Sequence, residues 1–243
     1  MSRTHTINTS APVVKTGDPS HAILEENGEV IVTTPWGWIS DTEAEALYRI
    51  AKSAPEKDAV IVEIGSWLGK STTLLGAGLK GKTNPKLYCV DPWMGWITKS
   101  QPTYIFAEPG DDCRQMDMYQ IFLDNVARAG LTDIVVPCRG TSEAIAATLP
   151  DLKIDMVFID ADHSKEMALL DLQLWVPKLK YDGLLTMHDV TVAPYFPPPP
   201  AKFFTGPIEA FEAYLDYNWA DAVLIDSLLV ARRKECTVQP ATA

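Results

Sequence analysis

Cysteine is scarce in this sequence, and its spacing suggests neither a metal site nor a disulfide. The chain has four cysteines, and none lies in a Cys-x-x-Cys pattern, so we expect neither a zinc knuckle nor a redox pair. We interpret all four as free thiols: Cys89, Cys113, Cys138 and Cys236. Two of them, Cys89 and Cys138, fall in apolar strand patterns, where cysteine usually packs as a small hydrophobic residue.

Positive charge and long apolar runs are also lacking. The chain carries 21 Lys and Arg against 32 Asp and Glu, a net charge of −11, and the basic residues form no cluster that could override this field. No apolar stretch reaches bilayer length, and residues 1–20 lack the apolar centre of a signal peptide. We therefore expect a soluble cytoplasmic protein with no nucleic-acid or membrane partner.

The sequence is rich enough in apolar residues for one substantial core. With 243 residues, 47% of them hydrophobic, we expect a single α/β domain over residues 31–236. Residues 1–30 are polar with little periodicity and are predicted to form a flexible arm, and residues 237–243 a tail. Ser40 followed by Glu43 predicts a capping box that opens a helix at about Asp41.

The central motif runs from Val60 to Ser71 and reads as strand, glycine turn and helix. A phosphate loop would need its first glycine one residue before Gly65, at Ile64. A dinucleotide fingerprint would need a second glycine where Trp67 stands. Neither a phosphate loop nor a pyrophosphate site is therefore predicted. The turn still suits a ligand, because glycine permits close backbone approach and a helix start offers free N–H groups.

Acidic residues and histidines follow three further predicted strands. Asp91 ends the strand at 86–90, where a carboxylate could accept hydrogen bonds from the hydroxyls of an adenosine ribose. The buried strand 154–159 is followed by Asp160, Asp162 and His163, and the strand 184–187 by His188 and Asp189. Such groups are costly to bury without partners, so they favour a functional site at one edge of the sheet.

The motif Glu63-x-Gly65-x-x-x-Gly69-x-Ser71 and the order of elements from about Ser40 to Arg232 resemble class I S-adenosylmethionine (SAM) methyltransferases. The segments around the two acidic strand ends are most similar to those of small-molecule O-methyltransferases. These enzymes are of the catechol and caffeoyl-CoA type and of the antibiotic and sugar type. The implied fold is α/β and Rossmann-like: a seven-stranded, mostly parallel sheet with helices on both faces and an antiparallel last strand.

The resemblance implies a SAM site at the glycine turn, with Ser71 or Glu63 holding the charged end of the methionine moiety and Asp91 binding the ribose. The full predicted cofactor set is Glu63, Gly65, Ser66, Trp67, Gly69, Ser71, Asp91, Trp93, Ser142 and Asp160. An apolar acceptor pocket is expected from Trp36, Trp93, Trp96, Tyr195 and Phe196.

The resemblance also places a divalent cation at Asp160, His188 and Asp189. His188 stands where the families carry a carboxylate, which would shift the preference from Mg²⁺ toward Mn²⁺, Fe²⁺ or Zn²⁺, or mark a site without a metal. His163 stands where catechol-type enzymes carry a catalytic lysine. An imidazole there could take a hydroxyl proton at neutral pH. The predicted catalytic residues are His163, His188 and Asp160.

The predicted function is SAM-dependent methyl transfer to a small molecule, most simply to a hydroxyl oxygen. Three alternatives stay open: an N-methyltransferase, a SAM-binding module that serves a partner, and a metal-dependent hydrolase or lyase built on the Asp and His cluster. The acceptor and the metal are not readable from the sequence, and a homo-oligomer is left open.

Overall fold

The computed structural model describes residues 13–18, 21–26, 29–35, 37–94, 117–190, 205–214 and 219–234. Four residues of the predicted acceptor pocket, together with two of the cysteines, lie outside the described residues: Trp36, Trp96, Tyr195, Phe196, Cys113 and Cys236. Within the described residues, no helix combines the length and the apolar character needed to cross a membrane.

The main sheet has seven strands in the order β6-β5-β4-β7-β8-β10-β9. In chain order they are β4 (Val60–Ile64), β5 (Lys86–Asp91), β6 (Val135–Arg139), β7 (Ile154–Ile159), β8 (Leu179–Met187), β9 (Trp219–Ile225) and β10 (Leu228–Arg233). The pairs from β6 through β8 are parallel, and β10 pairs antiparallel with both β8 and β9. The predicted mostly parallel sheet with an antiparallel end is confirmed.

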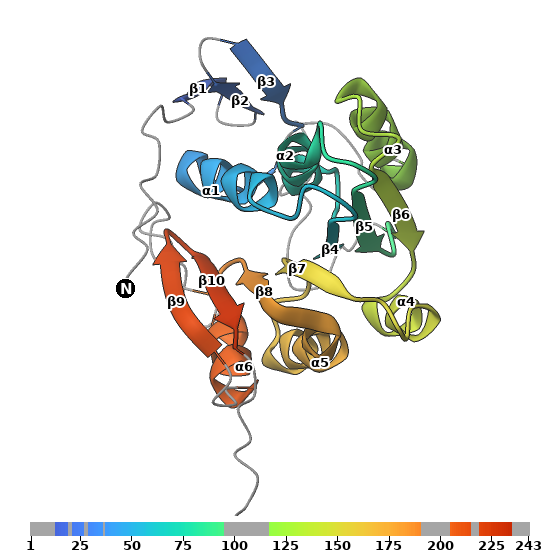
Figure 1. Cartoon of the computed structure of the whole chain (residues 1–243), viewed down its shortest axis with the longest axis vertical. Coiled ribbons are helices and arrows are strands. Elements are labelled where there is room, and N and C mark those ends of the chain that lie inside the picture. The colour runs from blue at the N-terminus through green and yellow to red at the C-terminus, as the bar shows by residue number, and fades with distance from the viewer. Residues whose placement is uncertain are drawn as a thin grey trace, which may run out of the picture.

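Helices cover both faces of this sheet (Figure 1). One face packs against α1 (Asp41–Lys52), α2 (Lys70–Leu79) and α3 (Met118–Arg128); the other packs against α4 (Ser142–Thr148), α5 (Lys165–Trp175) and α6 (Gly206–Tyr214), with a 3₁₀ turn, η3 (Val176–Lys178), after α5. The predicted capping box is present, because Ser40 and Glu43 exchange side-chain to backbone hydrogen bonds at the start of α1.

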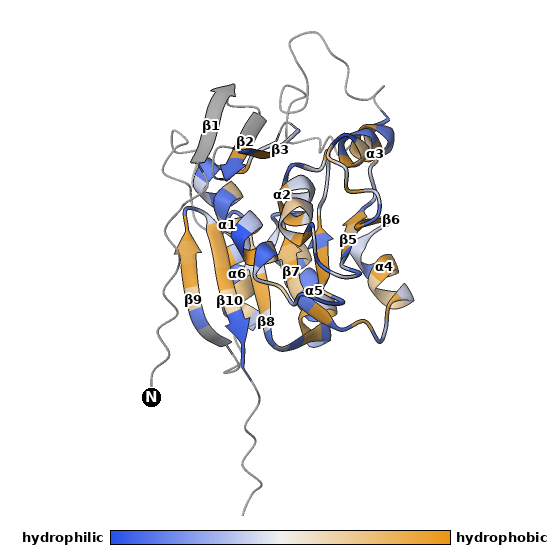
Figure 2. Cartoon of the chain, turned by 45° about the horizontal axis from the view of Figure 1, so that its top comes forward, coloured by the Kyte–Doolittle hydropathy of each residue, from blue (hydrophilic) through white to orange (hydrophobic). Residues whose placement is uncertain are grey.

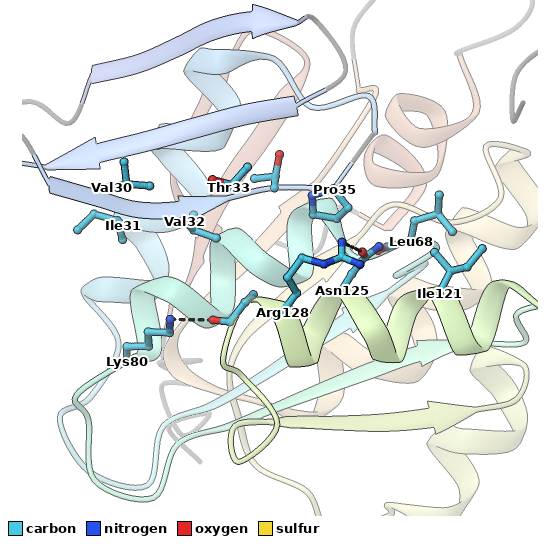
Figure 3. A pocket seen from close by; sticks show the side chains of 12 residues that line it. Val30, Ile31, Val32, Thr33, Pro35, Leu68, Lys80, Ile121, Asn125 and Arg128 are labelled. Carbon is cyan, nitrogen blue, oxygen red and sulfur yellow. Dashed lines mark hydrogen bonds between the residues drawn. The ribbon is translucent and has the colours of Figure 1, made fainter. Parts of the chain in front are cut away.

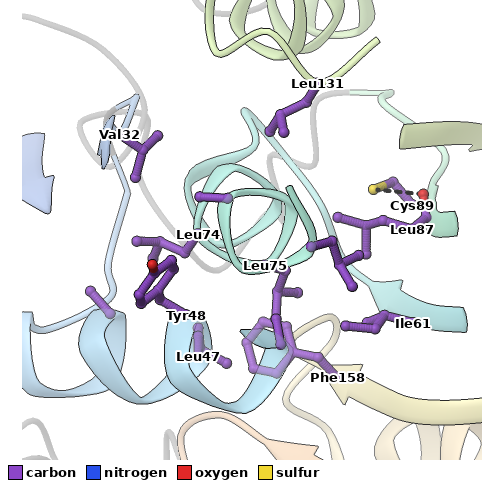
Figure 4. Close-up of a cluster of buried hydrophobic side chains, with 14 of the residues drawn as sticks. Val32, Leu47, Tyr48, Ile61, Leu74, Leu75, Leu87, Cys89, Leu131 and Phe158 are labelled. Atoms are coloured by element: carbon purple, nitrogen blue, oxygen red, sulfur yellow. Dashed lines mark hydrogen bonds between the residues drawn. The ribbon is translucent and has the colours of Figure 1, made fainter. Parts of the chain in front are cut away.

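Alternate residues along each central strand fill two separate cores. In β4, Ile61 faces the α1–α3 side, whereas Val62 and Ile64 face the α4–α6 side. Hydrophobic residues accordingly concentrate in the strands of the main sheet (Figure 2). Figure 4 shows α2 at the centre of the first core, where Leu75 packs between the strands and α1. Both cores hold the strand ends of the sheet in fixed positions.

A second, three-stranded antiparallel sheet precedes the main domain. Its strands are β1 (Val13–Asp18), β2 (His21–Glu26) and β3 (Glu29–Thr33). Leu24 and Val32 are buried against the α1–α2 side, and the Lys52 ammonium contacts the Glu26 carboxylate at 2.6 Å. Within the predicted arm, residues 13–18 and 21–26 form strands β1 and β2, and Leu24 packs against the helices.

Candidate active site

The strand order places a topological switch point at the carboxyl ends of β4 and β7. β5 and β7 lie on opposite sides of β4, so the chain leaves the sheet centre in two directions from this point. Open α/β sheets bind ligands at such a switch point. The segments that follow β4, β5, β7 and β8 therefore form the candidate site, and they contain the glycine turn and both acidic strand ends.

Gly65 brings the glycine turn into contact with the acidic end of β7. Its φ is 88°, and a Cβ at this position would lie 2.1 Å from the backbone oxygen of Asp160. The Asp160 N–H in turn donates to the Ile64 carbonyl at 2.9 Å. Glycine is thus required here by the neighbouring strand end, in addition to the ligand approach that the sequence indicated. The glycine turn and the backbone of Asp160 are therefore in direct contact.

Asp91, at the end of β5, holds the glycine turn through its carboxylate. Oδ2 accepts the Trp67 N–H at 2.9 Å, and Oδ1 accepts the Trp93 N–H at 2.6 Å. Burial raises the pKa of Asp91, although these backbone hydrogen bonds act in the opposite direction. A carboxylate offers about four acceptor sites, so capacity for further hydrogen bonds remains. The Ser66 N–H also bonds this carboxylate, and the acceptor capacity that remains can take a hydroxyl donor.

Three tryptophans surround the same turn. Trp67 has a φ of 42°, and its carbonyl accepts the indole N–H of Trp93 at 2.7 Å. Trp93 is buried and packs against Tyr119 and Phe122, with ring centroids 4.9 and 4.7 Å away. Trp38 stacks on Trp67 at 5.3 Å and is 44% exposed. Trp93 is therefore a buried support of the turn, and Trp38 presents an aromatic surface beside it.

Three polar residues of the predicted cofactor set are buried. Glu63, Ser66 and Ser71 are 0%, 2% and 5% exposed. The Thr72 hydroxyl donates to the Glu63 carboxylate. Burial raises the pKa of Glu63, against the effect of hydrogen bonds from Ser71, Thr72 and Ser66. Glu63 thus anchors the start of α2 to β4, and in this structure it has no exposed surface through which to contact a ligand.

Ser142, predicted to contact the cofactor, is engaged with α5. Its Oγ accepts the indole N–H of Trp175 at 2.8 Å. Ser142 also hydrogen-bonds Asp171. Burial raises the pKa of Asp171 to about 6, although the hydrogen bond from Ser142 acts in the opposite direction. The Ser142 hydroxyl therefore joins α4 to α5.

The acidic ends of β7 and β8 come together as the sequence indicated. Asp160, His163 and Asp189 each offer one ligand atom, and these atoms lie within 4.8 Å of one another. His163 Nε2 is 2.9 Å from Asp189 Oδ2 and 3.8 Å from Asp160 Oδ1. Asp162 is exposed and instead accepts the Ser164 N–H at the start of α5. The cluster is therefore smaller than the set of five residues that the hydrolase alternative used.

His188 lies beneath this cluster, with both ring nitrogens facing carboxylates. Nδ1 is 3.4 Å from Asp160 Oδ1 and 3.5 Å from Asp189 Oδ2. Nε2 is 3.1 Å from Glu43 Oε2, and the His188 side chain is 5% exposed. The sequence did not indicate the contact with Glu43, which is 145 residues away in the chain. The sequence indicated Glu43 only as part of the capping box, that is, as a partner of Ser40 at the start of α1.

Charges of opposite sign stabilise one another across this cluster. Burial by itself would lower the pKa of His188, but the charge of Asp160 and hydrogen bonds with Asp160, Asp189 and Glu43 raise the pKa well above its usual value. Burial would raise the pKa of Asp189, and hydrogen bonds from His163 and His188 lower it instead. Asp189 is therefore an anion, and the imidazoles beside it favour the protonated form when no other cation is present.

A separate cavity of about 660 Å³ lies away from the cluster (Figure 3). It is lined by β3, by Leu68 of the glycine turn and by α3 residues including Ile121 and Arg128. It contains none of the predicted catalytic or metal residues. The chemistry at the strand ends, rather than the volume of this cavity, therefore defines the candidate active site.

The sequence model of a methyltransferase domain matches residues 62–190, more than half of the 243 residues. This range begins in β4 and ends just after Asp189, so it spans the glycine turn and both acidic strand ends. The chain belongs to this methyltransferase family.

Solved structures of methyltransferases share the fold. An O-methyltransferase from Bacillus cereus in complex with SAH is 17% identical, with a TM-score of 0.55 over 81% of this chain and 82% of that one. The O-methyltransferase TomG from Streptomyces achromogenes, involved in tomaymycin synthesis and in complex with SAM, is 18% identical, with a TM-score of 0.55 over 81% of each chain. A methyltransferase from Geobacter sulfurreducens is 17% identical, with a TM-score of 0.54 over 81% of each chain.

Proposed function

We propose that this methyltransferase transfers the methyl group of SAM to a hydroxyl oxygen of a small molecule. One observation supports this proposal most: the backbone contact at Gly65 places the glycine turn next to the cluster of Asp160, His163 and Asp189. A hydroxyl is a weak nucleophile until it loses its proton, whereas an amine needs little deprotonation. Acid–base groups placed beside the cofactor turn therefore favour an oxygen acceptor over a nitrogen one.

The cofactor would lie over the glycine turn, with its ribose hydroxyls on Asp91. SAM carries a sulfonium whose methyl group is already activated, so the protein need only orient the acceptor and handle its proton. The two Asp91 oxygens are held in place by the Trp67 and Trp93 N–H groups, which orients their remaining lone pairs. Trp38, stacked on Trp67, would supply an apolar wall beside the cofactor.

His163 is the base in this proposal. Its side chain is 31% exposed, whereas that of His188 is 5% exposed and has carboxylates at both nitrogens. His163 can therefore reach an acceptor, and Asp189 at 2.9 Å can stabilise the imidazolium that forms. Asp189 and Asp160 raise the pKa of His163 against the effect of burial. A cation held by these carboxylates would offset that rise and leave the ring neutral, as a base requires.

A divalent cation is the second part of the proposal. Asp160, Asp189 and Nδ1 of His188 would hold it, and it would lower the pKa of a bound acceptor hydroxyl. The donor set fits, because a carboxylate oxygen of each aspartate already lies within 3.5 Å of the imidazole nitrogen of His188. Mixed nitrogen and oxygen donors suit Mn²⁺, Fe²⁺ or Zn²⁺ better than Mg²⁺.

Labelled methyl transfer tests this function. The full chain is incubated with methyl-labelled SAM and with matched pairs of acceptors that differ only in a hydroxyl or an amine, drawn from phenols, sugars and peptides. We expect label in hydroxyl acceptors. Label in the amines alone would contradict the oxygen assignment. The cytoplasmic location stays a prediction.

A further inference from the structure

Glu43 is a buried carboxylate that joins its own helix start to two distant parts of the fold. It is 3% exposed and lies in the first turn of α1. Oε1 accepts the N–H and the hydroxyl of Ser227, at 2.9 and 2.6 Å, from the turn between β9 and β10. Oε2 accepts the Ser40 N–H at 2.9 Å and lies 3.1 Å from His188 Nε2.

This arrangement places a hydrogen on Nε2 of His188, whatever Nδ1 carries. Both Glu43 oxygens already accept a backbone N–H, Oε1 from Ser227 and Oε2 from Ser40, so the carboxylate acts as an acceptor on both sides. The short contact with His188 then requires a hydrogen on Nε2, which leaves Nδ1 to face Asp160 and Asp189.

A capping role alone does not explain this residue. Capping needs only the exchange with Ser40, which a glutamine satisfies equally well. Burying a carboxylate costs several kcal/mol unless it is well paired, and here the pairing includes a histidine of the active site. Outer carboxylates that hold a ligating histidine fix its ring and its tautomer, and their loss typically weakens metal binding by about 10–100-fold.

We propose that Glu43 is a positioning residue of the active site, which holds His188 through Nε2 and so aims Nδ1 at the Asp160 and Asp189 carboxylates. The methyltransferase site thereby extends to α1 and to the turn between β9 and β10, through Glu43 and Ser227. The consequence for cation binding depends on the proposed function, whereas the orientation of the His188 ring does not.

The test uses Glu43→Gln in the full chain, with Glu45→Gln as the matched control. The Glu43→Gln side chain keeps the volume and the capacity to cap α1, but it loses the charge and one acceptor oxygen. Glu45 lies on the same helix, is 30% exposed and pairs with Arg49, so its change to glutamine leaves the His188 contact intact. Circular dichroism and urea unfolding identify any variant that fails to fold.

The first readout is the histidine ¹⁵N NMR spectrum without cofactor or metal. The chain has four histidines, and spectra of His163→Gln and His188→Gln assign the two in the site. We expect an exchange-protected Nε2–H signal for His188 in the wild type and in Glu45→Gln, and its shift or loss in Glu43→Gln. A wild-type His188 with no hydrogen on Nε2 would overturn the proposal, as would an unchanged signal in Glu43→Gln.

The second readout is the affinity for Mn²⁺ by calorimetry. We expect it to fall about 10–100-fold in Glu43→Gln and to stay unchanged in Glu45→Gln, while SAH affinity is kept in both. Equal Mn²⁺ affinity in Glu43→Gln and the wild type would overturn the link to the site. If the wild type binds neither SAH nor Mn²⁺, the proposed function fails, and the NMR readout still decides the ring orientation.

Discussion

Gly65 and Asp160 are joined so closely that no side chain fits between them: a Cβ on Gly65 would lie 2.1 Å from the Asp160 backbone oxygen. This contact couples the cofactor turn to the acidic end of β7. The relative positions of methyl donor and proton-accepting groups therefore depend on one glycine at the centre of the sheet.

Gly65→Ala should destabilise the fold strongly. The substitution adds a side chain at a φ of 88° and forces β4 and β7 apart, and backbone strain alone costs about 1–3 kcal/mol. Gly81→Ala is the matched control, because Gly81 has a φ of 84° but nothing within 4 Å of its Cβ position. Urea unfolding should show a clearly larger loss for Gly65→Ala. Equal losses would mean that the contact with Asp160 is unimportant.

Asp91→Asn should weaken cofactor binding while the chain stays folded. The amide keeps one acceptor oxygen for the turn but loses the second, and hydrogen bonds to charged groups contribute about 1.5–3 kcal/mol. SAH affinity should therefore fall by roughly one to two orders of magnitude, measured by calorimetry. Asp124→Asn, an acid-to-amide change at an α3 residue that bonds Gln120, should leave the affinity unchanged. Unchanged binding in Asp91→Asn would remove the ribose assignment.

The two histidines of the cluster should respond differently to substitution. His163→Gln removes the exposed base, so kcat should fall by about 10²–10⁴-fold with little change in Mn²⁺ affinity. His188→Gln removes the nitrogen that faces Asp160 and Asp189, so Mn²⁺ affinity should fall as well. Parallel kinetics and calorimetry give both quantities. The assignment of roles is reversed if His163→Gln abolishes Mn²⁺ binding and His188→Gln does not.

Asp171 should make the fold less stable as the pH rises. Burial raises its folded-state pKa to about 6, above the usual 3.8, so the folded state binds the proton more tightly than the unfolded state. Stability is then lost as the pH rises between these values, by up to about 3 kcal/mol. Asp171→Asn cannot ionise, so its stability advantage over the wild type should grow from about pH 4 to about pH 8. Urea unfolding at both pH values measures this difference, and a constant difference would contradict the raised pKa.

Local patterns allowed most of the main domain to be predicted. The run from Val60 to Ile64 and the strand ends at Asp91, Asp160 and Asp189 all appear where the sequence placed them. Parallel strands bring their carboxyl ends to one edge, so strand-end residues could be grouped without a structure. The three-stranded sheet before α1 was missed, because its stability depends on packing against α1 and α2 rather than on a strong local pattern.

The supporting contacts of the site could not be predicted for the same reason. Glu43 has a complete local explanation as a capping residue, and nothing in the sequence relates it to His188. Ser142 is a plausible cofactor contact from its position after β6, yet the structure pairs it with Trp175. These contacts depend on how α1 and α5 pack against the sheet, which is a property of the whole fold.

A calorimetric titration of the full chain with SAH shows whether the glycine turn and Asp91 form a SAM site. The product SAH retains the adenosine and amino-acid parts of SAM and cannot be consumed during the measurement. We expect saturable binding with one SAH per chain, weakened by Asp91→Asn. A folded chain that gives no heat of binding with either SAH or SAM would have no SAM site at this turn.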